Sequence, residues 1–320
     1  MNSMGPIVVC HDNATEAQDI LAERFANERL HYIDSPDLLA GALTDIQPEI
    51  AFTLKSDGMP GPSLRQVMRC PSMRWVYVGG SGYDHLLPLD NPSITVSNAA
   101  GVLASHLAEN VTGAMLALNG NFLRYAAQQQ DKRWQSLRFA PLAEQTLLVV
   151  GLGQIGAEVA ANAKHLGMRV LATRRTANPH PEVDEVLTTE ALPVLLPRAD
   201  FVSLHVRLEP QTQHLFSDDA FSRMRRGAFF INTSRGLIVD ESALLRALDS
   251  GQVGGAYLDV FEQEPLPSTS PLWHQPNVLI TPHAADNILG WQRQFLQHFA
   301  DNLDSYRAGQ AIANVVHRTA

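Results

Sequence analysis

A short apolar strand, three glycines and a helical stretch follow one another near the middle of the chain. Thr146–Val150 is the strand, the next six residues have the spacing GxGxxG, and 157–166 has helical character. In this pattern the first glycine makes a tight turn, the second lets a ligand approach the backbone, and the third lets the helix pack on the strand. The start of the helix offers N–H groups and partial positive charge to a pyrophosphate. We therefore expect a dinucleotide to bind here, at Gly151, Gly153, Gln154, Ile155 and Gly156.

The end of the following strand indicates which dinucleotide is bound. A carboxylate that binds the ribose 2′-hydroxyl of NAD is expected about 20 residues after the glycine turn. Thr173 stands 22 residues after Gly151, and Arg174 and Arg175 follow it. The next carboxylate is Glu182. These residues predict a 2′-phosphate site, and hence NADP in preference to NAD. The alternative is that both arginines are simply solvated.

Strands and helices alternate on both sides of this motif. Such alternation is typical of parallel, doubly wound sheets. The sequence therefore predicts an α/β fold with two doubly wound parallel-sheet domains. The expected strands before the motif are Ile7–Cys10, Glu49–Leu54, Arg74–Val78 and Ile94–Ser97. From the motif onward they are Thr146–Val150, Arg169–Thr173, Asp200–Val206, Ala228–Asn232, Gly255–Asp259 and Asn277–Thr281.

Two long helical stretches suggest how the domains are connected. A stretch over 99–119 leads into the second pattern, and another over 288–308 can return to the first domain. We expect a Rossmann cofactor domain at 99–284, inserted in a discontinuous flavodoxin-like substrate domain at 1–98 and 285–320.

The segment 121–142 carries Tyr125, Trp134 and Phe139 and is too long for a simple loop. We interpret it as an arm that packs on a second subunit of a homodimer; an irregular surface excursion is the alternative.

Composition excludes several classes of protein. The 320 residues carry a formal charge of −9, whereas a nucleic-acid-binding protein needs clustered Lys and Arg. The apolar runs are strand-sized, so no membrane span is expected. The start lacks a signal-peptide pattern, and two cysteines without metal-ligand spacing predict neither a disulfide framework nor a metal site. A cytoplasmic location is therefore expected.

Three polar motifs follow apolar strands late in the chain. They are Asn232–Gly236, Leu258–Pro265 and Thr281–Ala284. Ligands of open α/β sheets bind where the strands end, so these motifs are expected to form one site. A histidine can exchange a proton with a substrate oxygen, a glutamate beside it favours the imidazolium, and an arginine presents a planar fork of donors to a carboxylate.

Together with the glycine motif and Val78–Asp84, these segments resemble the D-2-hydroxyacid dehydrogenase family, which includes glyoxylate/hydroxypyruvate reductases. The resemblance runs through essentially the whole chain. It implies hydride transfer between a nicotinamide cofactor and a small 2-oxo or 2-hydroxy acid, with D stereospecificity; the choice of NADP(H) as that cofactor comes from residues 173–175, not from the resemblance. It also implies a catalytic triad and further cofactor contacts. The triad would be Arg235, Glu264 and His283, and the further contacts His205, Thr233 and Asp259. Arg207 stands where the family often has proline, which leaves the shape of the loop after His205 open.

The first domain offers a candidate binding site for the substrate carboxylate. The backbone N–H groups of Gly80, Ser81 and Gly82 can form an anion nest, and the resemblance implies the same position. Lys55, at the end of an expected strand, adds a positive charge to the site or is merely solvated.

Other functions remain open at this point. The corepressors called C-terminal binding proteins resemble the same family and use the fold as a non-catalytic dinucleotide sensor, but their extra peptide-binding segments and tails are not evident here. Formate dehydrogenases have glutamine at the position of Glu264 and a longer chain. The long type of phosphoglycerate dehydrogenase adds a regulatory domain, for which this chain has no room. Activity with NADPH and a 2-oxo acid discriminates the enzyme from the sensor.

Overall fold

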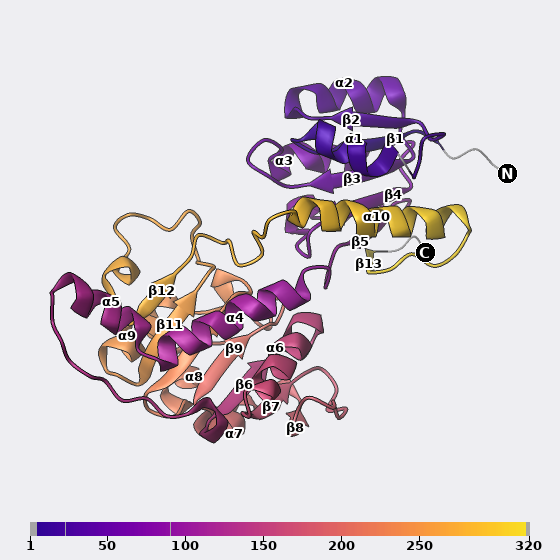
Figure 1. Cartoon of the computed structure of the whole chain (residues 1–320). Coiled ribbons are helices and arrows are strands. Elements are labelled where there is room, and N and C mark those ends of the chain that lie inside the picture. Colours follow the sequence, from indigo (N-terminus) through magenta and orange to yellow (C-terminus); the bar gives the residue numbers. More distant parts are fainter. Residues whose placement is uncertain (1–4, 23, 90, 318–320) are drawn as a thin grey trace. The chain divides into compact units, whose positions relative to one another are not determined.

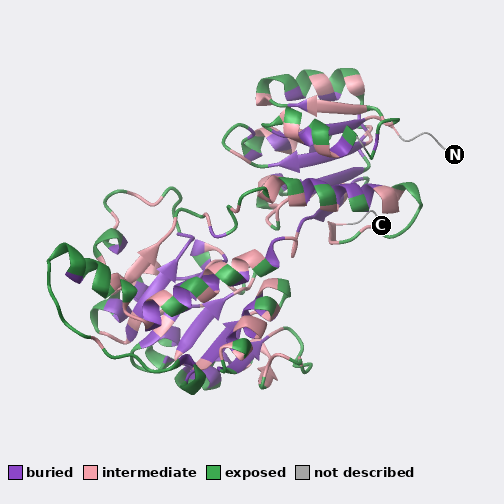
Figure 2. Ribbon diagram, in the orientation of Figure 1, coloured by how far each residue is buried: buried purple, intermediate pink, exposed green. Residues whose placement is uncertain are grey.

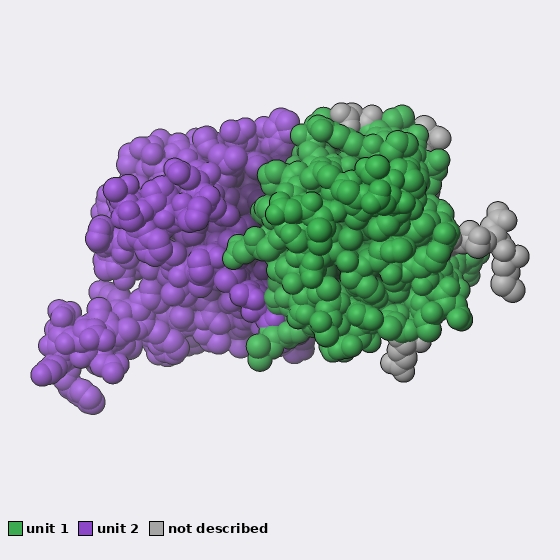
Figure 3. Space-filling model, turned by 90° about the horizontal axis from the view of Figure 1, so that it is seen from above, with its two compact units in different colours: residues 1–103, 289–320 green, residues 104–288 purple. Residues whose placement is uncertain are grey.

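The computed structural model describes residues 5–22, 24–89 and 91–317. The chain divides into two compact units, coloured separately in Figure 3. Unit 1 comprises residues 1–103 and 289–320, and unit 2 is the continuous stretch 104–288. The expected division of function at 98/99 and 284/285 stays a prediction. No helix in the described part of the chain is long and apolar enough to cross a bilayer.

Unit 1 is built on a sheet with the strand order β13-β5-β4-β3-β1-β2 (Figure 1). All neighbours are parallel except β13, which runs antiparallel to β5. The first five strands thus follow the 2-1-3-4-5 order of flavodoxin-like folds. The strands are β1 (Ile7–Cys10), β2 (Leu30–Ile33), β3 (Ile50–Leu54), β4 (Trp75–Gly79), β5 (Thr95–Asn98) and β13 (Val315–His317). The helices are α1 (Ala14–Ala22), α2 (Pro36–Ile46), α3 (Gly61–Leu64) and α10 (Trp291–Arg307), with 3-10 turns η1 (Arg65–Arg69) and η2 (Asp84–Leu86).

Helices cover both faces of this sheet because alternate strand residues point to opposite sides. Val76 and Val78 of β4 join a core cluster with Leu39 and Leu43 of α2 and Leu64 of α3. Trp75 and Tyr77 point the other way, where both rings pack at a tilt against Phe299 of α10, with centroids 5.5 and 5.3 Å away. The last helix is therefore part of the core of the unit that contains the first strands.

Unit 2 contains a parallel sheet with the order β12-β11-β10-β9-β6-β7-β8. The chain reverses direction across the sheet between β6 and β9, which is the switch point where α/β sheets bind ligands. The strands are β6 (Thr146–Val150), β7 (Arg169–Thr173), β8 (Glu185–Leu187), β9 (Phe201–Leu204), β10 (Ala228–Asn232), β11 (Val253–Leu258) and β12 (Val278–Ile280). The helices are α4 (Ala104–Asn119), α5 (Phe122–Gln130), α6 (Gln154–His165), α7 (Leu192–Leu195), α8 (Asp218–Arg223) and α9 (Glu241–Asp249). The 3-10 turns are η3 (Leu142–Glu144), η4 (Thr189–Ala191), η5 (Leu196–Arg198), η6 (Gly236–Ile238) and η7 (Pro271–His274).

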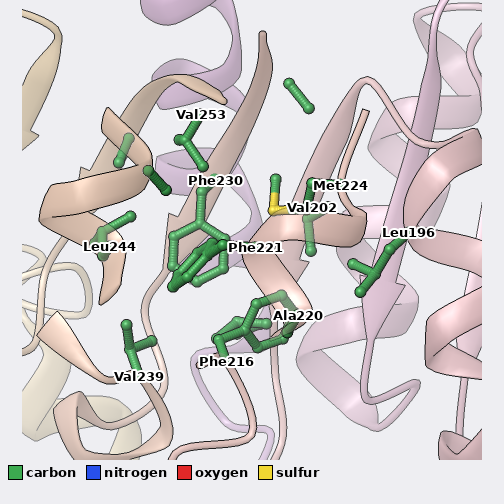
Figure 4. Close-up of a cluster of buried hydrophobic side chains, with 14 of the residues drawn as sticks. Leu196, Val202, Phe216, Ala220, Phe221, Met224, Phe230, Val239, Leu244 and Val253 are labelled. Atoms are coloured by element: carbon green, nitrogen blue, oxygen red, sulfur yellow. The ribbon is translucent and has the colours of Figure 1, made fainter. Parts of the chain in front are cut away.

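Two apolar layers enclose the central strands of unit 2, β6, β7, β9, β10 and β11, which are buried almost throughout (Figure 2). One layer packs the alanine-rich faces of α4 and α6 on the sheet. In the other layer, Phe216, Phe221 and Phe230 lie with ring centroids 5.0 to 5.7 Å apart (Figure 4). Aromatic rings at this spacing stabilise a core beyond the area they bury. The prediction of two parallel α/β domains, one of them a Rossmann domain, is confirmed.

Some elements differ from the sequence-based expectation. The helix expected from Ala99 begins only at Ala104. Strands β2, β8 and β13 were not expected. Within the expected arm, 122–130 is the helix α5, whereas residues 131–141 have no regular structure and are exposed except for a partly covered Leu137.

Candidate active site

The glycine loop at the end of β6 has the geometry that the motif requires. Gly151 has φ +102°, which side chains other than glycine rarely adopt, and a Cβ there would lie 2.7 Å from the backbone of His205. A Cβ on Gly156 would lie 2.3 Å from the carbonyl oxygen of Gly151. Nothing lies within 4 Å of the Cβ position of Gly153, just before α6, so a pyrophosphate can approach the backbone and the helix start. The loop therefore fits a dinucleotide.

The three residues predicted to recognise a 2′-phosphate, at the end of β7 and just after it, differ in burial and in contacts. Thr173 is fully buried, and its Oγ1 has no hydrogen-bond partner among the described residues. Its carbonyl oxygen accepts the N–H groups of Gly151 and Leu152, which ties β7 to the glycine loop. Arg174 is half-buried, and the more exposed Arg175 forms an ion pair of 2.8 Å with Glu209. Arg174 is thus the first side chain after β7 that solvent can reach.

His205 follows β9 and lies against the glycine loop. Its N–H donates to the carbonyl of Val150, and its Nε2 is 2.8 Å from the hydroxyl of Ser203. Burial lowers the pKa of His205 to about 4, so the ring is neutral at physiological pH. Thr233, which follows β10, has a buried Oγ1 with no partner among the residues described. Both predicted cofactor residues thus stand at strand ends on the same edge of the sheet.

The catalytic candidates follow three strands that are neighbours in the sheet. Arg235 comes after β10, Glu264 after β11 and His283 after β12. Gly236 allows the first two segments to meet, since a Cβ there would lie 1.8 Å from the carbonyl carbon of Phe261. Phe261 in turn donates its N–H to Oε1 of Glu264. A glycine is therefore required to bring the arginine loop against the glutamate loop.

Glu264 and His283 form a hydrogen-bonded pair. Nδ1 of His283 lies 2.7 Å from Oε2 of Glu264, and the side chains are 44% and 36% exposed. The hydrogen bond to Glu264 raises the pKa of His283, against the opposing effect of burial. Burial alone would raise the pKa of Glu264, but hydrogen bonds from His283 and from Phe261 N–H outweigh it, so this pKa is lowered. Both shifts favour the charged forms, an imidazolium beside a carboxylate, over what the isolated side chains would show, and the contact through Nδ1 leaves Nε2 to face a ligand.

Arg235 lies within electrostatic reach of this pair. Its positive charge lowers the pKa of Glu264 and also opposes protonation of His283. The Nη1 atom donates to the carbonyl of Ser234 at 2.7 Å, which fixes one side of the guanidinium. The structure therefore brings all three predicted catalytic residues together within unit 2.

Asp259 holds the loop that carries His283. Its carboxylate accepts the N–H groups of Ala284 and Ala285 and the hydroxyl of Thr281, and its carbonyl accepts the N–H of His283. His283 has φ +50°, a conformation that these bonds on both sides of it maintain. The sequence pattern indicated a cofactor contact for Asp259 but missed this anchoring.

Tyr257 and Asn110 extend the same network. The hydroxyl of Tyr257 donates to Asn110 at 2.6 Å and is 2.9 Å from the hydroxyl of Thr281. A tyrosine at a strand end gave no signal for this role, because its partner is on α4, far away in the sequence.

The substrate candidates of the first domain lie in unit 1. The loop from Gly80 to Gly82 follows β4, and Lys55 directly follows β3, the neighbouring strand. Gly80 has φ +133°, and its carbonyl accepts the N–H of Ala99. Neither Ser81 nor Gly82 donates its N–H to a backbone carbonyl in the described part of the chain. The loop thus keeps donors available for an anion.

Comparison with known proteins gives one consistent result. The family described as "D-isomer specific 2-hydroxyacid dehydrogenase, NAD binding domain" matches residues 112–285. A glyoxylate reductase from Korarchaeum cryptofilum is 34% identical over 262 residues, which is 78% of this chain and 77% of that protein.

Two solved structures resemble the whole chain. A D-isomer specific 2-hydroxyacid dehydrogenase family protein from Aeromonas salmonicida has a TM-score of 0.85 at 29% identity, with 98% of this chain and 99% of the other covered. An NADPH-dependent glyoxylate/hydroxypyruvate reductase from Sinorhizobium meliloti, in complex with NADP and sulfate, has a TM-score of 0.84 at 28% identity, with 98% of each chain covered.

Proposed function

The chain belongs to the D-isomer specific 2-hydroxyacid dehydrogenase family, and we propose that it reduces small 2-oxo acids of the glyoxylate or hydroxypyruvate type with NADPH, giving the D-2-hydroxy acid. Membership makes it an oxidoreductase that acts on a CH–OH group with a nicotinamide cofactor. The hydrogen-bonded Glu264–His283 pair beside Arg235 carries the proposal. The names of the relatives support the choice of substrate.

His283 exchanges the proton with the substrate oxygen. When bound, the nicotinamide supplies the hydride. In reduction, the imidazolium gives its Nε2 proton to the oxygen of the former carbonyl, and in oxidation the neutral ring accepts it back. Glu264 keeps Nδ1 engaged, so the proton to be transferred is on the other nitrogen. The hydrogen bond from Nδ1 to the Glu264 carboxylate thus determines that Nε2 is the nitrogen that exchanges the proton.

Arg235 binds the substrate. A guanidinium presents parallel N–H donors that match a carboxylate, which an ammonium group cannot do. Its charge also polarises the carbonyl that receives the hydride. The donors of the 80–82 loop and the ammonium of Lys55 are proposed to bind the carboxylate from unit 1. Each of these donor groups can attract a small anion to a protein whose net charge would otherwise repel it.

The cofactor is proposed to lie along the carboxyl edge of the unit 2 sheet. Residues 151–156 hold the pyrophosphate, and His205, Thr233 and Asp259 are the contacts nearest the nicotinamide. The unpartnered hydroxyl of Thr233 supports this, because a buried polar atom without a partner is costly unless a ligand provides one.

Preference for NADPH is proposed on the residues after β7. Arg174 is half-buried and forms no ion pair with a carboxylate among the described residues, so it is the main candidate for the 2′-phosphate. Arg175 would have to share its guanidinium with Glu209. The buried Thr173 contributes chiefly because it places no negative charge there that would repel the 2′-phosphate. The NADP in the Sinorhizobium meliloti structure supports this choice.

A homodimer and a cytoplasmic location complete the proposal. Trp134 is fully exposed and Phe139 is 63% exposed, and both stand on the arm 121–142. Large apolar side chains on an extended segment are typical of a surface that another subunit covers. Cys10 and Cys70 are free thiols, as expected in a reducing compartment.

An initial-rate panel tests the function. We expect turnover of glyoxylate and hydroxypyruvate with NADPH, and chiral analysis should give the D product from hydroxypyruvate. The non-catalytic sensor is not favoured, since the similar proteins from Korarchaeum cryptofilum and Sinorhizobium meliloti are both named as reductases. Tight NADPH binding without turnover of any 2-oxo acid would revive the sensor and contradict the proposal.

A further inference from the structure

A surface pocket of about 510 Å³ lies in unit 1, outside the residues discussed so far except for Lys55. Three cationic side chains line it: Lys55 from the end of β3, and Arg65 and Arg69 from η1. Asp84 and His85 of η2 also line it. The volume is that of a small-molecule site. Positive charge therefore gathers at one place on an acidic chain.

The three cations have no acidic partner within the described residues. Elsewhere in unit 1 such pairing is present: Arg24 binds Asp301 and Asp304, and Arg307 binds Glu28. Like charges close together repel one another, so an unpaired cluster costs free energy unless an anion joins it. Asp84 is the one acidic side chain in the lining, against three cations, which leaves an excess of positive charge.

His85 adds a polar atom to the same wall. Its Nε2 is buried and has no hydrogen-bond partner within the described residues. Burial lowers the pKa of His85, and the positive charge of Lys55 lowers it further. The ring is therefore neutral at physiological pH, and can donate or accept one further hydrogen bond.

The pocket lies beside the proposed carboxylate site. β3 and β4 are parallel neighbours, so Lys55 and the 80–82 loop stand at the same edge of the sheet, and η2 begins two residues after Gly82. A 2-oxo acid whose carboxylate binds the loop would therefore lie next to the pocket. Glyoxylate has no further substituent to reach it, whereas a substituted 2-oxo acid does.

We propose that this pocket binds a second anionic group, a phosphate or a carboxylate, at the far end of the substrate. The preferred substrates are then dianionic 2-oxo acids, with Arg65 and Arg69 as the specificity-determining residues. This inference rests on the proposed function, because it assumes that the chain reduces 2-oxo acids. It adds to that function the class of side chain that the substrate carries.

Matched substrates test the pocket. Hydroxypyruvate is compared with its 3-phosphate, and 2-oxobutyrate with oxaloacetate, each with NADPH. We expect the anionic partner of at least one pair to have the higher kcat/KM, and the pair that shows it distinguishes phosphate from carboxylate. Charged hydrogen bonds contribute about 1.5–3 kcal/mol each, which corresponds to roughly 10- to 150-fold.

Charge-removing variants then locate the effect. In Arg65→Gln/Arg69→Gln the ratio of kcat/KM, anionic over neutral, should fall at least about tenfold through a higher KM. Arg74→Gln is the matched control, since it removes an exposed arginine just before β4. This arginine lies at the opposite end of β4 from the 80–82 loop. Its ratio should stay at the wild-type value. Arg69→Gln alone, at an exposed position, serves if the double variant does not fold.

Two results would overturn the inference, and they differ from failure of the proposed function. An unchanged ratio in the double variant, or no preference for either anionic partner, removes the pocket from substrate binding while reduction of neutral acids still stands. Absence of turnover with every 2-oxo acid would instead overturn the proposed function and this inference with it.

Titration with inorganic phosphate gives a readout without turnover. The wild type should bind phosphate competitively with the anionic substrate, and the double variant should bind it at least about tenfold more weakly.

Discussion

Nδ1 of His283 lies 2.7 Å from Oε2 of Glu264, although 19 residues separate them in the chain. Two neighbouring parallel strands, β11 and β12, deliver the residues to one edge of the sheet. The contact decides which nitrogen of the ring is left for a substrate. Several predictions of activity depend on it.

Replacing His283 with Asn should lower kcat by about 10²–10⁴, the usual contribution of a positioned acid–base group. The dissociation constant for NADPH should change little, because the glycine loop belongs to other strands. Initial rates and a fluorescence titration measure the two quantities. His274→Asn, at an exposed turn, is the control. Wild-type kcat in the His283 variant would remove this residue from the mechanism.

The pH profile of reduction should respond to Glu264. The imidazolium is the reactive form, so kcat/KM for reduction falls as pH rises through the pKa of His283. Glu264 raises that pKa and thus extends activity to higher pH. Glu264→Gln should move the midpoint to lower pH, and oxidation, which needs the neutral ring, should reach its plateau at lower pH. Glu262→Gln, at a neighbouring position, is the control and should leave the midpoint unchanged. The same unchanged midpoint in Glu264→Gln would contradict the role assigned to Glu264.

Cofactor preference should depend on Arg174. Arg174→Ala should reduce the NADPH/NADH ratio of kcat/KM by roughly 10- to 150-fold, the value of one charged hydrogen bond. Arg174→Asp should reverse the preference, since a carboxylate repels the phosphate and binds the 2′-hydroxyl. An acid at Thr173 is a poorer test, because that side chain is fully buried. Arg169→Ala, at the other end of β7, should leave the ratio unchanged. Equal efficiency of the wild type with NADH would refute the preference.

The assembly prediction concerns the arm 121–142. Sedimentation should give a species of about twice the 35.1 kDa chain mass. Trp134→Ser/Phe139→Ser should shift it toward the monomer by removing two exposed apolar side chains. Leu38→Ser, which removes an exposed leucine of α2 in unit 1, should not. A wild-type species near 35 kDa at micromolar concentration would overturn the dimer.

Gly236→Ala tests how the arginine and glutamate loops meet. The added methyl would lie 1.8 Å from the carbonyl carbon of Phe261, so one segment must move. Overpacking of this kind costs about 1–3 kcal/mol, and the displacement of Arg235 should also lower kcat/KM. Thermal unfolding and initial rates measure both effects. Gly41→Ala is the control, since it lies in α2 with nothing within 4 Å of the new methyl. A stable, fully active Gly236→Ala variant would show that this contact is not needed.

Much of the fold was predictable because the signals were local. The strand and glycine pattern at 146–156 needs no partner to be recognised, and the strands expected around it form as β6 and β7. The missed strands β2, β8 and β13 are all edge strands and are mostly half-buried, so their sequences lack the continuous apolar run of a central strand. β13 is also antiparallel, which an alternating α/β pattern does not anticipate.

The site was predictable to the level of residues but not of contacts. Arg235, Glu264 and His283 stand out because polar residues follow apolar strands. That Thr173 would be buried and Arg174 half-buried depends on how β7 packs, which the sequence does not reveal. The grouping of Lys55 with Arg65 and Arg69 depends likewise on where η1 lies beside β3.

The placement of α10 has a consequence for biosynthesis. Trp75 and Tyr77 of unit 1 pack on Phe299, whereas all of unit 2 lies between them in the chain. A ribosome adds about 5–20 residues per second, so these rings wait roughly 10–40 s for the helix that covers them. Unit 2, being continuous, can fold during that wait. During this interval the first sheet of the nascent chain has an uncovered aromatic face. We therefore expect that a chaperone, or another unfolded chain, binds this face before α10 covers it.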